Sequence, residues 1–237
     1  MFVDTKYRSD AEETMDDFAM EGEILREALD KIASINRLLG GNKVTIEGVE
    51  KLLENKKSAT EIRILDVGCG NGDMLRALAE YGNAKGLNFK LIGMDANGFT
   101  IDYAKRLSAG FKNISYTCSD IFDEIKQARN YDVILCTLTL HHFKDDEILN
   151  LLSGFRKQAA IGIVINDLHR SRLAYYLFIA VCKVFGLNKM SKDDGLVSIL
   201  RGFKKNDLIN FAEKLNIRKH FLRWRWAFRY QWIIPTI

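Results

Sequence analysis

The sequence predicts an α/β protein with a doubly wound, mostly parallel seven-stranded sheet and an antiparallel last strand. From Glu61 onward, short apolar segments alternate with segments of helical periodicity, the pattern of parallel strands joined by crossover helices. The apolar segments are hydrophobic nearly throughout, as expected of strands covered on both faces. The last two segments are joined too closely for a parallel crossover, so we expect them to pair antiparallel.

The region before the sheet is predicted to be helical. Apolar residues recur at helical spacing from Ile24 to Leu39, and Gly40-Gly41 is expected to end this helix. A short second helix is predicted over Ile46–Glu54, with Thr45 as its cap. We interpret residues 1–58 as a helical lid segment and residues 59–237 as the main domain.

The elements of the main domain follow one another in a regular order. The first five strands are expected at Ile62–Val67, Lys90–Asp95, Ile114–Cys118, Tyr131–Cys136 and Ile161–Asn166. Helices are expected between them at Asp73–Tyr81, Thr100–Leu107, Ile121–Ala128 and Asp145–Lys157. After the fifth strand we expect a helix at Leu173–Phe185, a polar interruption at Leu187–Gly195 and a helix near Asn206–Leu215. The final strands are expected near Lys219–Trp226 and Phe228–Ile234.

The composition indicates a globular protein with a substantial core. The 237 residues are 47% hydrophobic and 28% charged, and a net charge of +4 does not by itself indicate nucleic-acid binding. The four cysteines form no C-x-x-C pair, which favours reduced thiols in a cytoplasmic protein over a disulfide framework or a metal site. The most apolar run is about half the ~20 residues that a transmembrane helix needs. Acidic residues near the N-terminus argue against a signal peptide.

A glycine-rich turn follows the first predicted strand. Gly68, Gly70 and Gly72 come directly after Asp66-Val67, and such glycines let a ligand lie against bare backbone. In an open α/β sheet this position, beyond the carboxyl end of a strand, is where ligands bind. The competing nicotinamide or flavin motif needs a glycine at position 73, where Asp73 would instead repel a pyrophosphate.

The stretch Ile64–Gly72 resembles the cofactor loop of class I S-adenosylmethionine-dependent methyltransferases, because an acidic residue is followed by three alternating glycines. From about Glu61 to the end, the chain is similar to the UbiE-like small-molecule branch of that family. The resemblance implies a Rossmann-like methyltransferase fold and S-adenosylmethionine as the cofactor. The ammonium group of this cofactor suits Asp66 and Asp73 as neighbours.

The resemblance also implies further cofactor contacts at the next strand ends. Asp95, with Ala96 beside it, is expected to bind the ribose hydroxyls, a geometry that suits a carboxylate. Asp120 is expected to accept from the adenine amino group and Ile121 to offer its backbone N–H, although Asp120 is alternatively a helix cap. Thr137 opens the loop that in this family borders both the methionine end of the cofactor and the acceptor.

Three histidines follow the ends of the fourth and fifth strands. A pKa near neutrality suits a histidine to general-base work, and we predict His142 and His169 as candidate bases, with Asp167 orienting His169. His141 is expected beside the acceptor, although one of the two adjacent histidines is alternatively a packing or capping residue. Arg170 is expected to hold an acidic group on the acceptor, and a solvated arginine at a capped helix start is the alternative.

Two segments are expected to wall the acceptor pocket. The helix from Leu173 to Val181 is apolar on nearly every face, so its Tyr175 is predicted to contact an apolar or aromatic acceptor. The N-terminal helix is expected to lie over the site as a lid, with Arg8 reaching into the pocket. The alternation from Leu222 to Phe228 is predicted to give a strand with one buried aromatic face.

These features predict methyl transfer to a small, apolar or aromatic acceptor, at a hydroxyl or an activated carbon, by in-line displacement. The alternatives are a cofactor-binding partner subunit without its own activity, an RNA or protein methyltransferase, and a dehydrogenase. The loop after the fourth strand lacks the Asp/Asn-Pro-Pro-aromatic motif of enzymes that methylate base amino groups, which argues against such a substrate without excluding other nucleic-acid targets. A small-molecule partner is favoured over a nucleic acid. The sequence leaves open whether the protein is a monomer or a homodimer.

Overall fold

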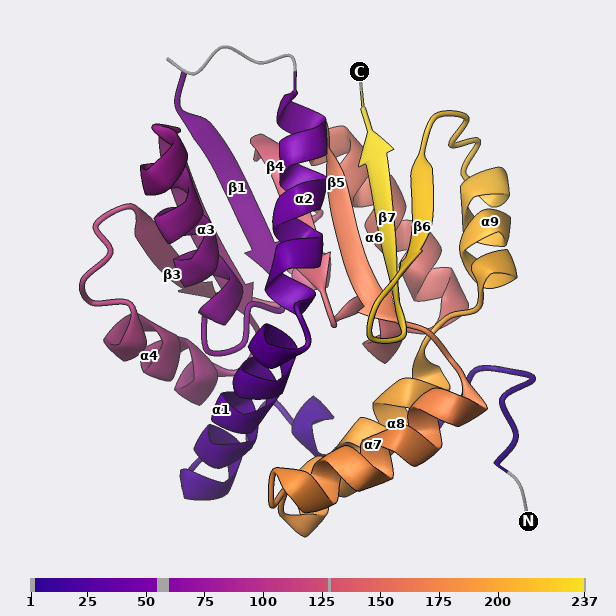
Figure 1. Cartoon of the computed structure of the whole chain (residues 1–237). Coiled ribbons are helices and arrows are strands. Elements are labelled where there is room, and N and C mark those ends of the chain that lie inside the picture. The colour runs from indigo at the N-terminus through magenta and orange to yellow at the C-terminus, as the bar shows by residue number, and fades with distance from the viewer. Residues whose placement is uncertain (1–2, 55–59, 128, 237) are drawn as a thin grey trace.

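The computed structural model describes residues 3–54, 60–127 and 129–236. Within these residues, one seven-stranded sheet carries helices on both faces (Figure 1). Its strands are β1 (Ile62–Val67), β2 (Phe89–Asp95), β3 (Ile114–Cys118), β4 (Tyr131–Thr137), β5 (Ala159–Leu168), β6 (Phe221–Arg225) and β7 (Arg229–Pro235). All seven lie within two residues of their predicted bounds.

The strand order is β3-β2-β1-β4-β5-β7-β6. Strands β1 to β5 pair in parallel, whereas β7 runs antiparallel to both β5 and β6, which confirms the predicted antiparallel last strand. The order reverses between β1 and β4, because the chain builds outward to β3 and then returns to the other side of β1. Such a reversal opens a crevice at the carboxyl edge of the sheet, where α/β proteins bind ligands.

The two faces of the sheet contribute alternate side chains to two cores. Ile64 of β1 belongs to the core that lies under α3 (Asp73–Lys85). The next residue, Leu65, belongs to the opposite core, which is covered by α6 (Asp145–Gln158) and α9 (Lys205–Lys214). Burial on both faces explains why the strands are apolar nearly throughout.

The two N-terminal helices have different roles. Helix α1 (Glu23–Leu38) ends close to its predicted limit, but α2 (Gly41–Leu53) begins directly after Gly40, several residues earlier than predicted. Gly40 takes a left-handed conformation that turns one helix into the other. Thr45 is therefore not a cap but a buried residue inside α2, with its Oγ1 3.1 Å from Oγ1 of Thr137. Helix α2 packs on β5 and β7 and covers one face of the sheet.

A group of helices lies beyond the carboxyl edge of the sheet, at the bottom of Figure 1: α1, α7 (Arg172–Val184) and α8 (Lys189–Arg201). The predicted polar interruption over 187–195 was wrong, because most of this stretch forms the first half of α8. Its polar residues cap the helix and make tertiary contacts. Asn188 caps the helix, and Asp194 accepts hydrogen bonds from the backbone N–H groups of residues 14 and 15 in the short 3-10 helix η1 (Thr14–Asp16).

The remaining differences concern short elements. Helix α4 (Gly98–Leu107) matches its prediction closely, whereas α5 covers only Ile121–Glu124, and the predicted end at Ala128 lies outside the described residues. So does the predicted boundary between residues 58 and 59. None of the helices in the described ranges has the length and hydrophobicity to cross a membrane.

The aromatic face of β6 is less buried than predicted. Trp224 of β6 and Trp226, in the turn that follows it, are 49% and 66% exposed.

Candidate active site

The glycine-rich turn lies between β1 and α3, at the crevice where the strand order reverses. Gly68, Gly70 and Gly72 all have positive φ angles, which side chains other than hydrogen rarely tolerate. A Cβ atom on Gly68 would also collide with Thr139, at the end of β4. The turn therefore brings bare backbone against the loop after β4.

Asp95 lies at the end of β2 and faces this turn. Its Oδ2 accepts a hydrogen bond from the backbone N–H of Gly70 at 3.0 Å, and its Oδ1 accepts from that of Asn97 at 3.0 Å. Burial raises its pKa, although these amides and the nearby His142 oppose the shift. Each carboxylate oxygen retains acceptor capacity for a ligand hydroxyl.

Asp66 is a buried acid without a matching donor. Its side chain is almost fully buried at the end of β1, and Oδ1 has no hydrogen-bond partner. Burial, together with the charge of Asp95, raises the pKa of Asp66 to about 8. The other acid beside the turn, Asp73, already accepts from Arg37 at 2.7 Å and Asn42 at 2.7 Å. An ammonium group fits Asp66 chemically, because it brings both a donor and a positive charge.

The other predicted cofactor residues also line the cavity at this edge: Ala96, Asp120, Ile121 and Thr137. Asp120 caps α5 by accepting from the backbone N–H of Phe122 at 2.7 Å through Oδ1. The alternative role of a helix cap is therefore real, and it leaves Oδ2 available for a ligand.

The cavity has a volume of about 2010 Å³ and extends from the glycine turn to α1 and α7. Pockets for one small ligand usually hold about 300–1,000 Å³, so this cavity has room for a cofactor and a second molecule. Its far wall is apolar, with Leu25, Leu29, Ile32, Leu177, Phe178 and Val181 among the lining residues. The wall predicted from the apolar helix is present, but Tyr175 is not part of it; its ring packs edge-on against Tyr176 instead.

Asp167 orients a different histidine from the one predicted. Its Oδ1 lies 2.7 Å from Nδ1 of His141, and its Oδ2 accepts from the His141 backbone N–H. Burial raises the pKa of Asp167, but the adjacent His141 outweighs burial and holds the pKa below its usual range. His141 is almost fully buried, so this pair fixes the loop after β4 from within.

His142 pairs with a carboxylate from the N-terminal segment. Its Nδ1 lies 2.7 Å from Oδ1 of Asp16, and its side chain keeps partial exposure to the cavity. The other oxygen of Asp16 bonds Arg201 at 2.6 Å, and Arg201 also donates to the backbone carbonyl of His142. A carboxylate on Nδ1 places the proton there in the neutral ring, so that Nε2 carries the lone pair.

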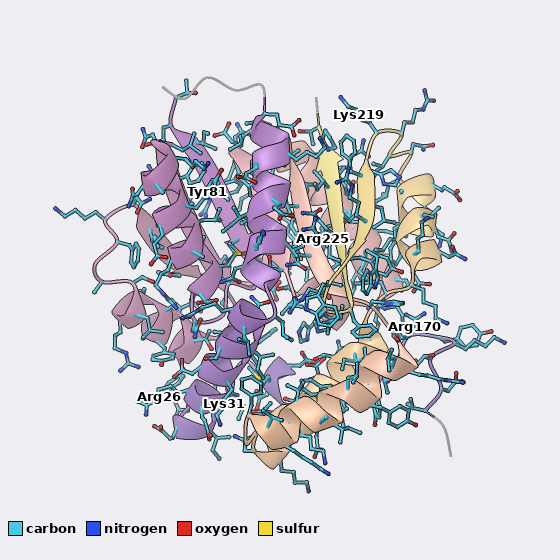
Figure 2. The ribbon with its side chains drawn as sticks, in the orientation of Figure 1. Arg26, Lys31, Tyr81, Arg170, Lys219 and Arg225 are labelled. Carbon is cyan, nitrogen blue, oxygen red and sulfur yellow. The ribbon has the colours of Figure 1, made fainter. Side chains whose placement is uncertain are left out.

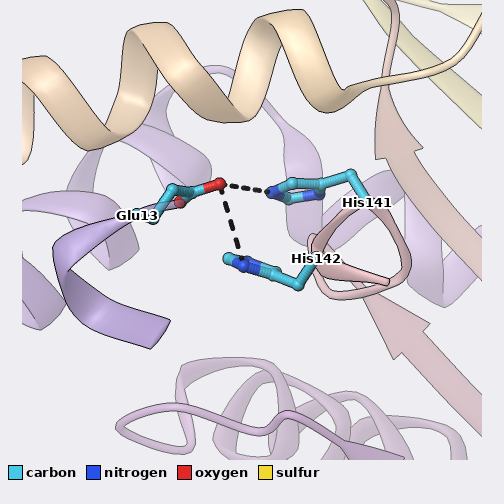
Figure 3. A group of neighbouring side chains, drawn as sticks. All are labelled: Glu13, His141 and His142. Atoms are coloured by element: carbon cyan, nitrogen blue, oxygen red, sulfur yellow. Dashed lines mark ion pairs between the residues drawn. The ribbon is translucent and has the colours of Figure 1, made fainter. Parts of the chain in front are cut away.

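Glu13 faces both histidines from the opposite side, as Figure 3 shows. Its Oε1 is 3.8 Å from Nε2 of His141 and 3.7 Å from Nδ1 of His142, distances compatible with shared coordination of an ion. Arg201 approaches the same oxygen at 3.7 Å, and Ser198 donates to Oε2 at 2.7 Å. Oε1 has no hydrogen-bond partner, and the guanidinium of Arg201 supplies a positive charge beside it, so we interpret the group as an electrostatic cluster of the protein.

His169 is placed differently from the predicted base. Its Nδ1 accepts a hydrogen bond from the indole N–H of Trp224 at 3.2 Å, and its ring stacks on Phe228. In the neutral ring this bond puts the proton on Nε2 and leaves no free lone pair. Burial and the charge of Arg170 lower its pKa.

The two arginines predicted to reach the acceptor instead hold the N-terminal segment. Arg170, at the junction of β5 and α7 (Figure 2), is buried, donates to the carbonyls of Thr5 and Gly202, and pairs with Asp207 at 3.0 Å. Arg8 donates to the carbonyls of residues 141, 143 and 201 and pairs with Asp145 at 2.7 Å. Both arginines line the cavity, but their printed bonds go to protein acceptors, and their predicted contacts with the acceptor stay a prediction.

Sequence reasoning missed Glu13, Asp16, Arg201 and Arg229. The first two lie in an acidic segment without clear periodicity, and their role depends on how that segment folds back. Arg201 and Arg229 are isolated along the chain. The one available signal was an arginine at the start of a strand that is otherwise apolar, at Arg229.

Comparison with known proteins agrees with this geometry. A family model described as a methyltransferase domain matches residues 58–188. The chain is 34% identical over 169 residues to a ubiquinone biosynthesis O-methyltransferase of Coxiella burnetii (strain RSA 331 / Henzerling II), a match that covers 71% of this chain and 68% of the relative. This chain belongs to the class I S-adenosylmethionine-dependent methyltransferases. The corresponding enzyme of Rickettsia canadensis (strain McKiel) is 30% identical over 57% of this chain and 55% of its own length.

Solved structures of this methyltransferase fold superpose well on the chain. The plantazolicin methyltransferase BpumL in complex with SAH aligns with a TM-score of 0.68 at 16% identity, over 89% of this chain and 90% of that one. Magnesium protoporphyrin IX methyltransferase from Synechocystis PCC 6803, with bound SAM, aligns with a TM-score of 0.56 at 13% identity, over 93% and 88%. These likenesses confirm the predicted fold. The methyltransferase uses S-adenosylmethionine, and the unpartnered Asp66 and the open acceptor positions on Asp95 fit that cofactor.

Proposed function

We propose that this methyltransferase transfers a methyl group to a hydroxyl, or to an activated carbon, of a small aromatic or apolar molecule. The observation that carries the proposal is the cavity of about 2010 Å³, which continues past the cofactor turn to an apolar wall on α1 and α7. Named relatives with O-methyltransferase activity in ubiquinone biosynthesis support the same acceptor class.

The cofactor, when bound, supplies an electrophilic methyl group on a sulfonium. The proposed cofactor contacts are Asp66 for the ammonium, Asp95 with Ala96 for the ribose, Asp120 with Ile121 for the adenine, and the backbone of Gly68, Gly70, Gly72 and Thr137. Asp66 is the strongest of these, because its buried Oδ1 has no hydrogen-bond partner and an ammonium would supply both a donor and a positive charge that opposes the raised pKa.

His142 is the proposed general base. Its Nδ1 is held by Asp16, its Nε2 bears the lone pair, and its ring borders the cavity close enough to Asp95 to influence that carboxylate. In this role Nε2 accepts the proton that the acceptor hydroxyl or carbon loses. Asp167 is a positioning residue that acts through His141, and we assign no proton transfer to His169.

The test is a turnover assay with purified protein and S-adenosylmethionine against phenols, quinols, a basic peptide and an RNA. Mass spectrometry of the products identifies the methylated class. Methylation of a phenol or quinol is expected. Methylation of only the peptide or the RNA would reject the small-molecule proposal, and cofactor binding with no turnover on any acceptor would favour a partner subunit.

We also propose a cytoplasmic location. All four cysteines are free, which agrees with a reducing compartment.

A further inference from the structure

Arg229 is a buried cation without a partner that matches its charge. It is 4% exposed, and its Nε and Nη1 atoms have no hydrogen-bond partner. The other arginines around the cavity differ sharply, since Arg8, Arg170 and Arg201 each bond backbone carbonyls and a carboxylate. The unused donors of Arg229 therefore need another explanation.

An unpaired buried charge is expensive, because the protein interior solvates it far less well than water. Burial lowers the pKa of Arg229 to about 10, opposed by the charge of Asp167, so the group stays charged at neutral pH. Asp167 makes no hydrogen bond to it in the structure, since the bonds to this carboxylate come from His141 and from the Leu168 backbone N–H. The protein retains the charge at a cost that an anionic ligand would offset.

The position of Arg229 favours such a ligand. It begins β7 opposite Leu168, lines the cavity, and lies beside Gly41, where a Cβ atom would come within 3.1 Å of its Cζ. The nearby Arg225, labelled in Figure 2, does not line the cavity and already pairs with Glu47 of α2. Thus one arginine of this hairpin is neutralised by the protein and the other is presented to the cavity.

The strand that carries Arg229 is separate from the one that precedes the cofactor turn. That turn follows β1, and β7 is three strands away in the sheet, or roughly 14 Å at the usual strand spacing. The turn before β7 also lines the cavity, through Trp226, Ala227 and Phe228. An anion held there would belong to the acceptor more readily than to the cofactor.

We propose that Arg229 anchors a carboxylate-binding subsite in the cavity, which selects acceptors that carry an acidic group. The inference rests on the proposed function and deepens it, since an apolar wall on α7 and a single buried guanidinium together suit an aromatic acid. A planar guanidinium binds a carboxylate through two parallel hydrogen bonds, which also orients the ring.

Calorimetry on the protein saturated with S-adenosylhomocysteine tests the subsite. Benzoate and its uncharged analogue benzamide are the probes, and wild type is expected to prefer benzoate by at least tenfold. Arg229→Gln should abolish this preference, Arg229→Lys should keep part of it, and the matched control Arg225→Gln should keep all of it. Equal binding of the two probes by wild type, or an unchanged preference in Arg229→Gln, overturns the acceptor subsite.

A second titration identifies the source of the carboxylate. S-adenosylhomocysteine carries an amino-acid carboxylate, and 5′-deoxy-5′-methylthioadenosine lacks it. Weaker binding of the first alone in Arg229→Gln would reassign the guanidinium to the cofactor and overturn the acceptor proposal. Wild-type binding of S-adenosylhomocysteine is measured in the same series, so a failure of cofactor binding is distinguished from a failure of the subsite.

Thermal unfolding of the free protein separates binding from structure. Because Arg229 lacks a partner, Arg229→Gln should leave the melting temperature unchanged or raise it. A large fall in melting temperature in both Arg229→Gln and Arg229→Lys would show a structural role and overturn the proposal.

Discussion

The imidazole of His142 and the carboxylate of Asp16 form a 2.7 Å hydrogen bond across 126 residues of sequence. This bond joins the loop after β4 to the N-terminal segment, and Arg201 of α8 secures the same carboxylate. The proposed base is therefore oriented by a residue outside the sheet domain. The position of the N-terminal segment is therefore expected to affect the chemistry of the site.

Replacing the proposed base should slow the chemical step. His142→Gln is expected to lower kcat by about 10²–10⁴-fold, the usual contribution of a positioned general base, with little change in cofactor affinity. Asp16→Asn should lower kcat by a smaller factor, because the ring loses its orientation but keeps Nε2. Asp102→Asn, an exposed carboxylate on α4, serves as the control in steady-state kinetics. Unchanged kcat in His142→Gln would eliminate this residue as the base.

Removing the proposed ribose ligand, Asp95, should weaken cofactor binding. Asp95→Ala is expected to cost about 1.5–3 kcal/mol in binding of S-adenosylhomocysteine, the scale of a hydrogen bond to a charged group. Calorimetry measures the change, and Asp123→Ala, on the exposed side of α5, is the matched control. An affinity equal to that of wild type would refute the assignment of Asp95.

The raised pKa of Asp66 predicts a stability that falls with pH in the free protein. Its pKa is about 8 in the folded state against an ordinary value of 3.8, so the folded state binds the proton more tightly. The associated stability is fully present below pH 3.8 and is lost as the pH rises toward 8. Urea unfolding at several pH values should show this decline, and Asp66→Asn should flatten it. A decline of the same slope in Asp66→Asn would contradict the pKa shift.

The contact between α7 and α8 predicts a selective effect on the acceptor. A side chain at Gly195 would collide with the ring of Phe178, which lines the cavity. Gly195→Val should push this ring into the acceptor space and raise the acceptor KM by about tenfold, while cofactor affinity stays constant. Leu173→Ala, on an exposed part of α7 away from the cavity, is the control. A loss of cofactor affinity equal to the loss for the acceptor would argue against a separate acceptor wall.

The sheet and the cofactor turn could be predicted from the sequence alone. Strand positions follow from local apolar runs, and the positive φ angles of the turn require glycine at Gly68, Gly70 and Gly72. Asp66 and Asp95 follow from their places at strand ends, since parallel strands bring their carboxyl ends to one edge. These features depend on residues close together in sequence or on the general geometry of a parallel sheet.

The hydrogen-bond partners of the polar side chains became known only from the folded structure. Asp167 bonds His141 and not His169, because the loop after β4 folds over the end of β5. His169 instead accepts a hydrogen bond from Trp224 of β6. Arg170 was predicted to hold an acidic group on the acceptor, but its guanidinium donates to the carbonyl of Thr5 in the N-terminal segment. No role was predicted for Arg229, whose Nε and Nη1 have no hydrogen-bond partner. Each of these outcomes depends on contacts between residues distant in sequence, and a local pattern carries no information about which partner a long side chain finds.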